Sequence, residues 1–192
     1  MYASGMPTAR RLHHTYDQYL EVERLSSVRH EFLDGEIYAM AGGTPEHGIL
    51  AARLTALLAA GVPAGCHVAS SDVKIFIEAT GLATYPDVSV VCGPLVRAAR
   101  DSLALTNPVL LVEVTSPSTE DYDRGDKLSQ YRQIASLQAV LLVSHTSKRI
   151  TVVQRDTGAW VTRDVRPGER VVLAAPAITF DVDAVYAALD GL

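Results

Sequence analysis

Two largely apolar segments most constrain the fold of this chain. Residues 109–115 read VLLVEVT and residues 139–143 read AVLLV, and helical spacing relates Tyr131 and Ile134 between them. A strand–helix–strand unit of this kind predicts a parallel pair of strands with a right-handed crossover. Strands that are apolar on both faces are typical of a buried sheet covered by helices. The chain is therefore expected to adopt an α/β fold.

The segments before this unit predict a helix, a hairpin and a second helix. A T-x-x-Q capping box indicates that the first helix begins at Thr15. Asp34-Gly35, between two strand-like runs, is typical of a type I′ hairpin turn. Thr44 can cap the second helix, with a proline at its first position, and Gly61 helps to end it.

The other segments complete a mixed sheet. Val68–Ile77 and Thr84–Cys92, joined by a turn at Gly81, predict an antiparallel hairpin. We expect residues 93–107 to form a loop with at most one helical turn. The remaining expected elements are a helix capped by Asp123 (Arg124–Ala135), a hairpin (148–155 and 159–165) and a short helix (181–189). The prediction is a mixed sheet flanked by helices, with an N-terminal helix and hairpin and a C-terminal β appendage.

Length and composition favour a single globular domain. The chain has 192 residues, of which 48% are hydrophobic and 20% charged. One domain over residues 1–192 can bury a sizeable core, and we expect residues 1–14 to be flexible. The sequence has no apolar run near the ~20 residues that span a bilayer and no apolar core of a signal peptide. We therefore expect a cytoplasmic protein.

Charge and cysteine content narrow the classes of partner. The net charge of −5 argues against a protein that coats nucleic acid broadly. This net charge is still compatible with a local basic groove or a metal site.

Cys66 and Cys92 do not form a Cys-x-x-Cys pair, so a zinc knuckle is not indicated. A disulfide between them is an alternative, but a large core does not need one, and we expect two buried thiols.

Two carboxylates lie in segments that should be buried. Glu113 lies between Val112 and Val114 in the apolar strand, and Asp87 starts the apolar run DVSVV. A lone ionised carboxylate in a dry strand is costly unless it is paired or binds a metal. An ion pair with Arg or Lys is one reading of Glu113. Since neighbouring strands lie ~4.8 Å apart, the other reading is a hard cation, Mg²⁺ or Mn²⁺, shared with Asp87.

Lys127 and Glu46 are further candidates for this chemistry. Lys127 lies on the helical face of Tyr131, so its ammonium could stabilise negative charge near the sheet. Alternatively, its stem reaches solvent. Glu46, in the first turn of the helix after Thr44, could bind metal or only interact with the helix dipole. Asp72 is a strand carboxylate to which the sequence assigns no role.

Two motifs give the chain a family resemblance. YPDVSVV at residues 85–91 and VEVTSPSTEDYDRGDKLSQYR at residues 112–132 resemble the Uma-type putative restriction endonuclease family of the PD-(D/E)XK nuclease superfamily. Shorter segments extend the resemblance over almost the whole chain. It implies a restriction-endonuclease-like mixed β-sheet core flanked by helices, and a metal-dependent phosphodiesterase centre.

The resemblance also implies roles for particular residues. Asp87 matches the Pro-Asp acid of the family, and Glu113 matches the acid of its third motif. The superfamily's Glu-x-Lys is absent because residue 115 is threonine, and the family's displaced lysine on the next helix matches Lys127. Glu46 is the match for the superfamily's helix carboxylate. Asp87, Glu113 and Glu46 are thus the predicted metal ligands, and these three with Lys127 are the predicted catalytic residues.

We therefore hypothesise an endonuclease that uses Mg²⁺ or Mn²⁺ to hydrolyse phosphodiester bonds in DNA. The alternative is a catalytically inactive nucleic-acid-binding or protein-interaction module on the same scaffold, because fold does not guarantee activity. Cleavage of both strands of DNA would favour a homodimer. Other chemistry is weakly indicated. His30, His47 and His67 are too scattered in the sequence to support a zinc site, and we interpret His47 as structural.

Overall fold

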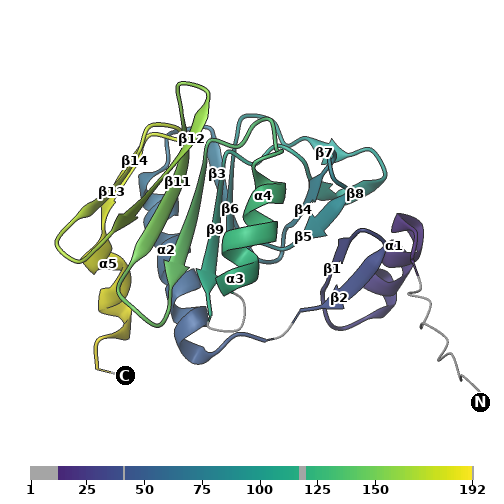
Figure 1. Ribbon diagram of the computed structural model, residues 1–192, viewed down its shortest axis with the longest axis horizontal. Coiled ribbons are helices and arrows are strands. Elements are labelled where there is room, and N and C mark those ends of the chain that lie inside the picture. Colours follow the sequence, from purple (N-terminus) through teal and green to yellow (C-terminus); the bar gives the residue numbers. More distant parts are fainter. Residues whose placement is uncertain (1–12, 41, 117–119, 192) are drawn as a thin grey trace, which may run out of the picture.

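The N-terminal elements form as their capping and turn residues indicate (Figure 1). The computed structural model describes residues 13–40, 42–116 and 120–191. Helix α1 (Tyr16–Leu25) begins with the capping box of Thr15. Strands β1 (His30–Leu33) and β2 (Glu36–Ala39) are joined by Asp34-Gly35, whose φ angles of 50° and 80° suit a type I′ turn. Helix α2 (Pro45–Gly61) is capped by the Thr44 hydroxyl. The predicted helix starts and hairpin turn are confirmed.

Residues 1–14 were expected to be flexible, and residues 1–12 of this segment lie outside the described residues. His14 is described, and its backbone N–H donates to the carbonyl of Gly35 at 2.7 Å. The hairpin turn therefore holds the chain from this residue onward.

A six-stranded mixed sheet forms the main core. Its strand order is β12-β11-β10-β9-β6-β3. Strands β9 and β10 pair in parallel, from Leu110 with Ala139 to Thr115 with Ser144, as predicted. The predicted terminal hairpin, β11–β12, extends the same sheet in antiparallel fashion. The strands are β3 (Cys66–Ser70), β6 (Val88–Cys92), β9 (Leu110–Thr115), β10 (Ala139–Ser144), β11 (Ile150–Asp156) and β12 (Ala159–Val165).

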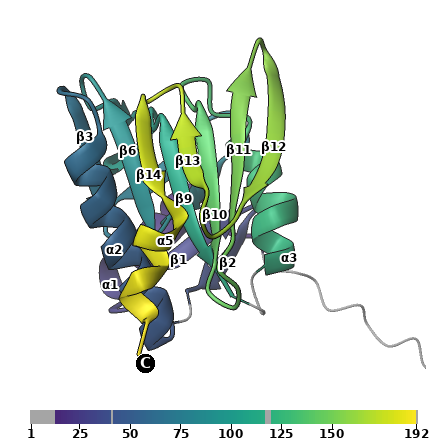
Figure 2. The same ribbon diagram turned by 90° about the vertical axis from the view of Figure 1, so that its left-hand side faces the viewer.

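Helices cover both faces of this sheet (Figures 1 and 2). One face packs against α2 and α5 (Val182–Tyr186), which is followed by a 3₁₀ turn (Ala187–Leu189). The other face packs against a helical segment made of α3 (Glu120–Tyr122), a π-helical turn η1 (Asp123–Lys127) and α4 (Leu128–Tyr131). On β9, Val112 faces the α2 side and Leu111 the α4 side. Within the described ranges, no helix has both the length and the apolar character needed to cross a membrane.

A second six-stranded sheet carries the β1–β2 hairpin. Its strand order is β2-β1-β5-β4-β8-β7, and a separate two-stranded sheet near the C-terminus pairs β13 with β14. Tyr16 and Tyr19 of α1 pack on Phe32 of β1. The additional strands are β4 (Lys74–Ile77), β5 (Leu82–Thr84), β7 (Arg97–Ala98), β8 (Asp101–Leu105), β13 (Arg170–Leu173) and β14 (Ile178–Asp181).

The sequence predicted two continuous strands, at Val68–Ile77 and Thr84–Cys92. This prediction is wrong, because each segment forms two shorter strands. Strand β3 pairs with β6 in the main sheet, whereas β4 pairs with β5 in the second sheet, antiparallel in both cases. One break contains Asp72 and the other contains Pro86, which has no N–H for a strand ladder. The chain therefore changes sheets immediately before Asp87.

Two local predictions are also wrong. Residues 93–107 contain the β7–β8 hairpin rather than a loop. The Lys74–Ala104 pairing joins β8 to β4 in parallel, a long-range contact that the local sequence does not signal. The helix predicted to start after Asp123 begins at Glu120 instead, and its helical part ends at Tyr131. Asp123 thus lies inside the helical segment, within the π-helical turn, and does not cap it.

Cys66 and Cys92 form a disulfide instead of the predicted pair of buried thiols. The two residues are direct partners in the antiparallel β3–β6 register. Side chains of directly opposed residues lie close together on one face of a sheet, which explains the bond. Both cysteines are half-buried. The pairing could not be chosen from the sequence because it depends on the register of β3 and β6.

A buried ion pair links β4 to β8 within the second sheet, and a hydrogen bond from Tyr16 connects α1 to it. Lys74 Nζ lies 2.8 Å from Asp101 Oδ2, and the Tyr16 hydroxyl donates to the same oxygen at 3.0 Å. Lys74 and Asp101 are only 4% and 6% exposed. Burial acts to raise the pKa of Asp101, but the Lys74 ammonium and the hydrogen bonds outweigh it and hold that pKa below 3.8.

Replacing Asp101 with Asn should destabilise the protein by about 3–5 kcal/mol, because the Lys74 ammonium would remain buried without a counter-charge. Since folding lowers the pKa of Asp101, its contribution is present above pH 3.8 and is lost as the pH falls through the folded-state pKa. Urea unfolding of both proteins between pH 3 and pH 7 measures this difference. The exposed pair of Asp17 with Arg100 offers a control, because Asp17→Asn should cost less than about 1 kcal/mol. Equal costs for the two variants would contradict the prediction.

Candidate active site

Asp87 lies at the point where the chain enters β6. The register pairs Val88 with Val112, which puts Asp87 beside the end of β9. Its Oδ2 accepts the Val114 N–H at 2.7 Å and lies 3.2 Å from Nε2 of His47, which comes from the first turn of α2. The backbone of one strand and the side chain of one helix therefore fix this carboxylate.

Lys127 joins three carboxylates. Its Nζ lies 2.9 Å from Glu31 Oε1, 3.1 Å from Glu113 Oε1 and 3.9 Å from Asp123 Oδ1. The Tyr131 hydroxyl donates to the same oxygen of Glu113. Lys127 and Glu113 are each only 5% exposed. Lys127 therefore points toward the sheet, as the helical face predicted, and the ion-pair reading of Glu113 is realised in this structure.

Glu31 is a functional candidate that the sequence reasoning missed. It comes from β1, in the second sheet, and is 9% exposed. It accepts a hydrogen bond from the Thr84 hydroxyl, and the Tyr122 hydroxyl lies 3.4 Å from its Oε2. The available signal was a carboxylate within the short strand-like run HEFL. That signal resembles the one that identified Glu113, but the run before Asp34-Gly35 looked like an ordinary hairpin strand.

Burial and like charges set the protonation of the site. Burial, opposed by Lys127 and helped by Asp87, raises the pKa of Glu113 to about 8. Burial acts to lower the pKa of Lys127, but Glu113, Tyr131 and Glu31 outweigh it and raise that pKa well above its usual value. The hydrogen bond with Asp87 raises the pKa of His47. The lysine is therefore held as an ammonium within an excess of acidic groups.

These side chains surround one cavity of about 560 Å³. Its walls come from both sheets, from the first turn of α2 and from the helical segment that contains Lys127. The turn after β10 adds His145, whose Nδ1 is buried and has no hydrogen-bond partner among the residues that the structure describes. The acidic and basic residues in the described lining of the cavity are Glu31, His47, Asp87, Glu113, Asp123, Lys127 and His145.

Glu46 and Asp72 lie elsewhere. Glu46 is exposed in the first turn of α2 and does not line this cavity, although its neighbour His47 does. Hydrogen bonds from its own backbone and from Thr44 lower the pKa of Glu46. Its predicted role as a metal ligand stays a prediction. Asp72 is exposed and forms an ion pair with Arg29.

The donor chemistry of Asp87 and Glu113 fits a hard divalent cation. Both carboxylates border the same cavity, and their mutual repulsion helps to raise the pKa of Glu113. A cation would relieve that repulsion. In the part of the chain that the structure describes, no three His, Cys, Asp or Glu side chains are arranged to hold a metal. Mg²⁺ often binds through only one or two protein carboxylates, with water and substrate phosphate as its other ligands. A two-carboxylate site is consistent with that pattern.

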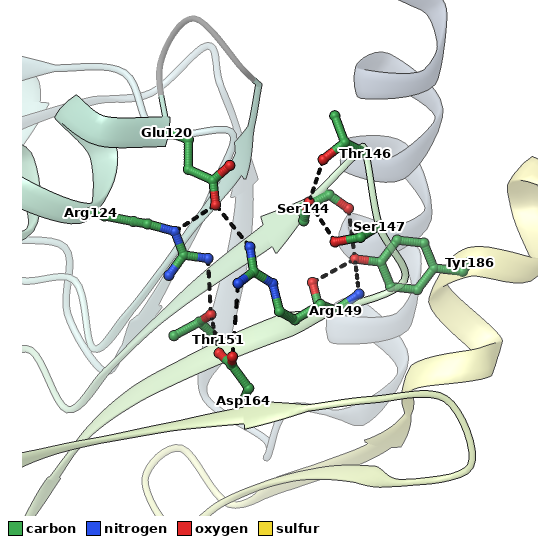
Figure 3. Close-up of polar contacts among 9 residues, drawn as sticks. All are labelled: Glu120, Arg124, Ser144, Thr146, Ser147, Arg149, Thr151, Asp164 and Tyr186. Carbon is green, nitrogen blue, oxygen red and sulfur yellow. Dashed lines mark hydrogen bonds and ion pairs between the residues drawn. The ribbon is translucent and has the colours of Figure 1, made fainter.

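A second polar cluster fixes the start of the helical segment (Figure 3). Glu120 Oε1 accepts hydrogen bonds from Arg124 Nε at 2.7 Å and from Arg149 Nη2 at 2.8 Å. Arg124 and Arg149 lower the pKa of Glu120. Arg124 also donates to Thr151 of β11 at 3.1 Å. The segment that delivers Lys127 is thereby tied to the main sheet at its first residue.

The same cluster fixes the turn that carries His145 (Figure 3). The Tyr186 hydroxyl, from α5, lies 2.7 Å from the carbonyl oxygens of Ser144 and Arg149. It also accepts the Arg149 N–H at 3.1 Å. The two ends of the turn are therefore held by one side chain, which sets the position of this wall of the cavity.

Comparisons with known proteins agree with this architecture. The model of the Uma2 family, described as putative restriction endonuclease, matches residues 16–184. An uncharacterized Synechocystis protein, slr1290, is 40% identical over 175 residues, which cover 90% of this chain and 91% of that protein. Another uncharacterized Synechocystis protein, sll1609, is 31% identical over 142 residues, or 73% of this chain and 80% of that protein.

A solved structure supports the fold. The crystal structure of a putative nuclease belonging to DUF820 from Anabaena variabilis matches with a TM-score of 0.73 and 15% sequence identity. The match covers 90% of this chain and 97% of the other. The predicted α/β fold is confirmed.

Replacing Glu113 with Gln should preserve the fold of the metal-free protein, because Lys127 keeps Glu31 as a partner 2.9 Å away. The folded-state pKa of Glu113, about 8, exceeds its ordinary 4.5. Between these values the folded state holds a proton that the unfolded state releases, so wild-type stability falls as the pH rises. The glutamine variant should therefore gain in relative melting temperature from pH 5 to pH 8. A loss of about 3 kcal/mol or more at every pH would show instead that Glu113 is a structural partner.

Proposed function

Because this chain belongs to the Uma2 family of putative restriction endonucleases, we propose that it hydrolyses phosphodiester bonds in DNA with Mg²⁺ or Mn²⁺. The convergence of Asp87, Glu113 and the buried Lys127 at one cavity is the observation that carries this proposal. These are two carboxylates that suit a hard cation, and one ammonium that suits a phosphate in its transition state.

Each residue has a role that follows from its contacts. A cation held by Asp87 and Glu113 supplies Lewis-acid stabilisation of negative charge on the phosphate. His47 and the Val114 N–H keep Asp87 oriented toward the cavity. Lys127, held as an ammonium by the neighbouring acids, acts as a positive charge near the scissile group rather than as a base. Glu31 sets the position of that ammonium from the opposite sheet.

One observation favours the alternative of an inactive nucleic-acid-binding or protein-interaction module. The charge of Lys127 is already offset by Glu31 and Glu113 at 2.9 and 3.1 Å, as in a purely structural ion-pair cluster. Metal binding separates the two functions, because a structural cluster has no need of a divalent cation. For a nuclease that cuts both strands of a duplex, a symmetric dimer is the expected assembly.

The first prediction concerns the metal. Replacing Asp87 with Asn should weaken Mn²⁺ binding by at least about tenfold, the smallest cost usually seen when a group that supports a metal site is lost, and should abolish DNA cleavage. Isothermal titration calorimetry and a plasmid-cleavage assay with Mg²⁺ or Mn²⁺ measure the two effects.

Glu46→Gln tests the third predicted ligand, an acidic residue in the first turn of α2 that lies outside the cavity. If the Mn²⁺ affinity of Glu46→Gln is unchanged, the protein ligands of the metal are confined to residues that line the cavity. If the affinity falls, Glu46 is the third ligand expected from the sequence. Unchanged metal binding in Asp87→Asn would contradict the proposed site.

The second prediction isolates Lys127. Lys127→Met keeps an apolar stem and removes the ammonium, so cleavage should fall by about 100-fold or more, the scale of one lost transition-state contact. Mn²⁺ affinity should stay similar or rise, because a neighbouring positive charge has been removed. Thr115 lies two residues after Glu113 and so on the same face of β9. Adding Thr115→Lys should recover part of the rate. A wild-type rate for Lys127→Met at saturating Mg²⁺ would exclude this role.

A further inference from the structure

A second cavity adjoins the candidate active site. Its volume is about 670 Å³, and it shares Asp87, His47 and Thr44 with the first cavity. Both volumes lie in the range of about 300–1,000 Å³ that is usual for ligand sites. The two cavities meet at Asp87, the carboxylate that is expected to hold the cation. A ligand bound next to Asp87 can therefore extend into the second cavity.

The chemistry of the second cavity differs from that of the first. The first is bordered by Glu31, Glu113 and Asp123, whereas the second has Asp87 as the acid in its described lining and gains the guanidinium of Arg29. Small polar and glycine residues form much of its remaining wall, including Ser27, Gly43, Thr44, Gly48 and Ser71. The positively charged guanidinium and the small hydrogen-bonding groups suit a sugar–phosphate backbone better than an apolar ligand.

Arg29 is placed for such a contact. Its guanidinium carbon lies 5.5 Å from the centre of the Tyr85 ring, and Tyr85 borders the first cavity. The Arg29 side chain is 43% exposed and pairs with Asp72, whose side chain is 73% exposed. Asp72 itself does not line the cavity. A phosphate can therefore reach Arg29 only in competition with the Asp72 carboxylate.

Gly48 lines this cavity without adding a side chain to it. It lies in the fourth helical position of α2, and a Cβ built on it would meet no atom of the described residues within 4 Å, apart from its chain neighbours and its own helix backbone. Glycine is a poor residue for a helix interior compared with alanine, so the helix itself gains nothing from it. The absent side chain leaves space that a close-packed ligand can use.

We propose that the two cavities form one groove, and that the second cavity binds the nucleotide adjoining the scissile phosphate, with Arg29 on the next backbone phosphate. This inference rests on the proposed nuclease function. The expected substrate is a polynucleotide whose strand extends beyond the cleaved phosphodiester bond toward Arg29. Asp72 then acts as a competitor that limits how tightly Arg29 holds the strand.

The first experiment fills the cavity from Gly48. We compare Gly48→Ala, Gly48→Gln and Gly48→Trp on an oligonucleotide and on bis(p-nitrophenyl) phosphate, a diester without nucleotides. The oligonucleotide kcat/KM should fall as the side chain grows, by about tenfold or more for tryptophan, mainly through KM. Hydrolysis of the small diester should stay within about twofold, because its reacting centre is untouched. Ala59→Trp, at an exposed position late in α2, is the matched control and should leave both substrates unchanged.

The second experiment uses two substitutions with opposite expected effects. Arg29→Gln should weaken binding of a fluorescent oligonucleotide, measured by anisotropy with Ca²⁺ in place of Mg²⁺. It should also reduce the slope of log affinity against log salt by about 0.7 for a single strand, the loss of one phosphate contact. Asp72→Asn frees Arg29 from its ion pair and should strengthen binding by a few-fold, an effect that disappears in the Arg29→Gln background.

The outcomes separate the groove from the proposed function. A wild-type protein that hydrolyses neither substrate and binds no oligonucleotide overturns both. A wild-type protein that cleaves DNA, with Gly48→Trp equal to Ala59→Trp on the oligonucleotide, overturns the groove alone. The groove is also overturned if Arg29→Gln and Asp72→Asn shift oligonucleotide binding in the same direction, or not at all.

Discussion

The interaction on which the site depends is the burial of the Lys127 ammonium between carboxylates from two sheets. Glu31 belongs to the second sheet and Glu113 to the main sheet, and Lys127 comes from the crossover between β9 and β10. A buried carboxylate without a partner is strongly destabilising. The ammonium therefore allows two acids to face one cavity where the sheets approach each other. The π-helical turn that ends at Lys127 places Asp123 in the same cluster, and such turns are frequent at functional sites.

The places where the chain changes sheets also determine the groove. Two apolar runs are interrupted, one at Asp72 and the other at Pro86. Each interruption contains a carboxylate between two strands, and each carboxylate has a basic partner. Asp87 lies beside His47 of α2, and Asp72 pairs with Arg29 before β1. One break therefore places Asp87 in the lining of both cavities, and the other places Asp72 against Arg29, which lines the second cavity.

The distribution of charge explains how an acidic chain can suit a nucleic-acid substrate. With a net charge of −5, the protein has no general attraction for polyanions. The acids that face the first cavity are the ligands that we propose for a cation, and the described part of the second cavity carries Arg29. Under the proposed function, nucleic-acid binding through such a surface would depend on a divalent ion and a few local contacts. This differs from proteins that coat DNA through many surface lysines and arginines.

Local chemistry in the sequence determined much of this protein. The capping box at Thr15, the turn at Asp34-Gly35 and the parallel strands around residues 109–143 follow from short-range preferences and apolar pattern. Asp87 and Glu113 stood out because charged groups in apolar segments need a physical reason, and Lys127 stood out because it shares a helical face with Tyr131. Their meeting at one cavity agrees with that reasoning.

Tertiary structure decided the rest, because long-range pairing has no local signature. Strand β8 joins the rest of the second sheet by pairing with β4, and the disulfide forms because the register of β3 and β6 opposes Cys66 to Cys92. Glu31 entered the site only because the second sheet brings β1 against Lys127, a contact between residues far apart in the sequence. Glu46 and His47 are adjacent in the sequence, yet only His47 lines the cavity, since neighbours on a helix point in different directions.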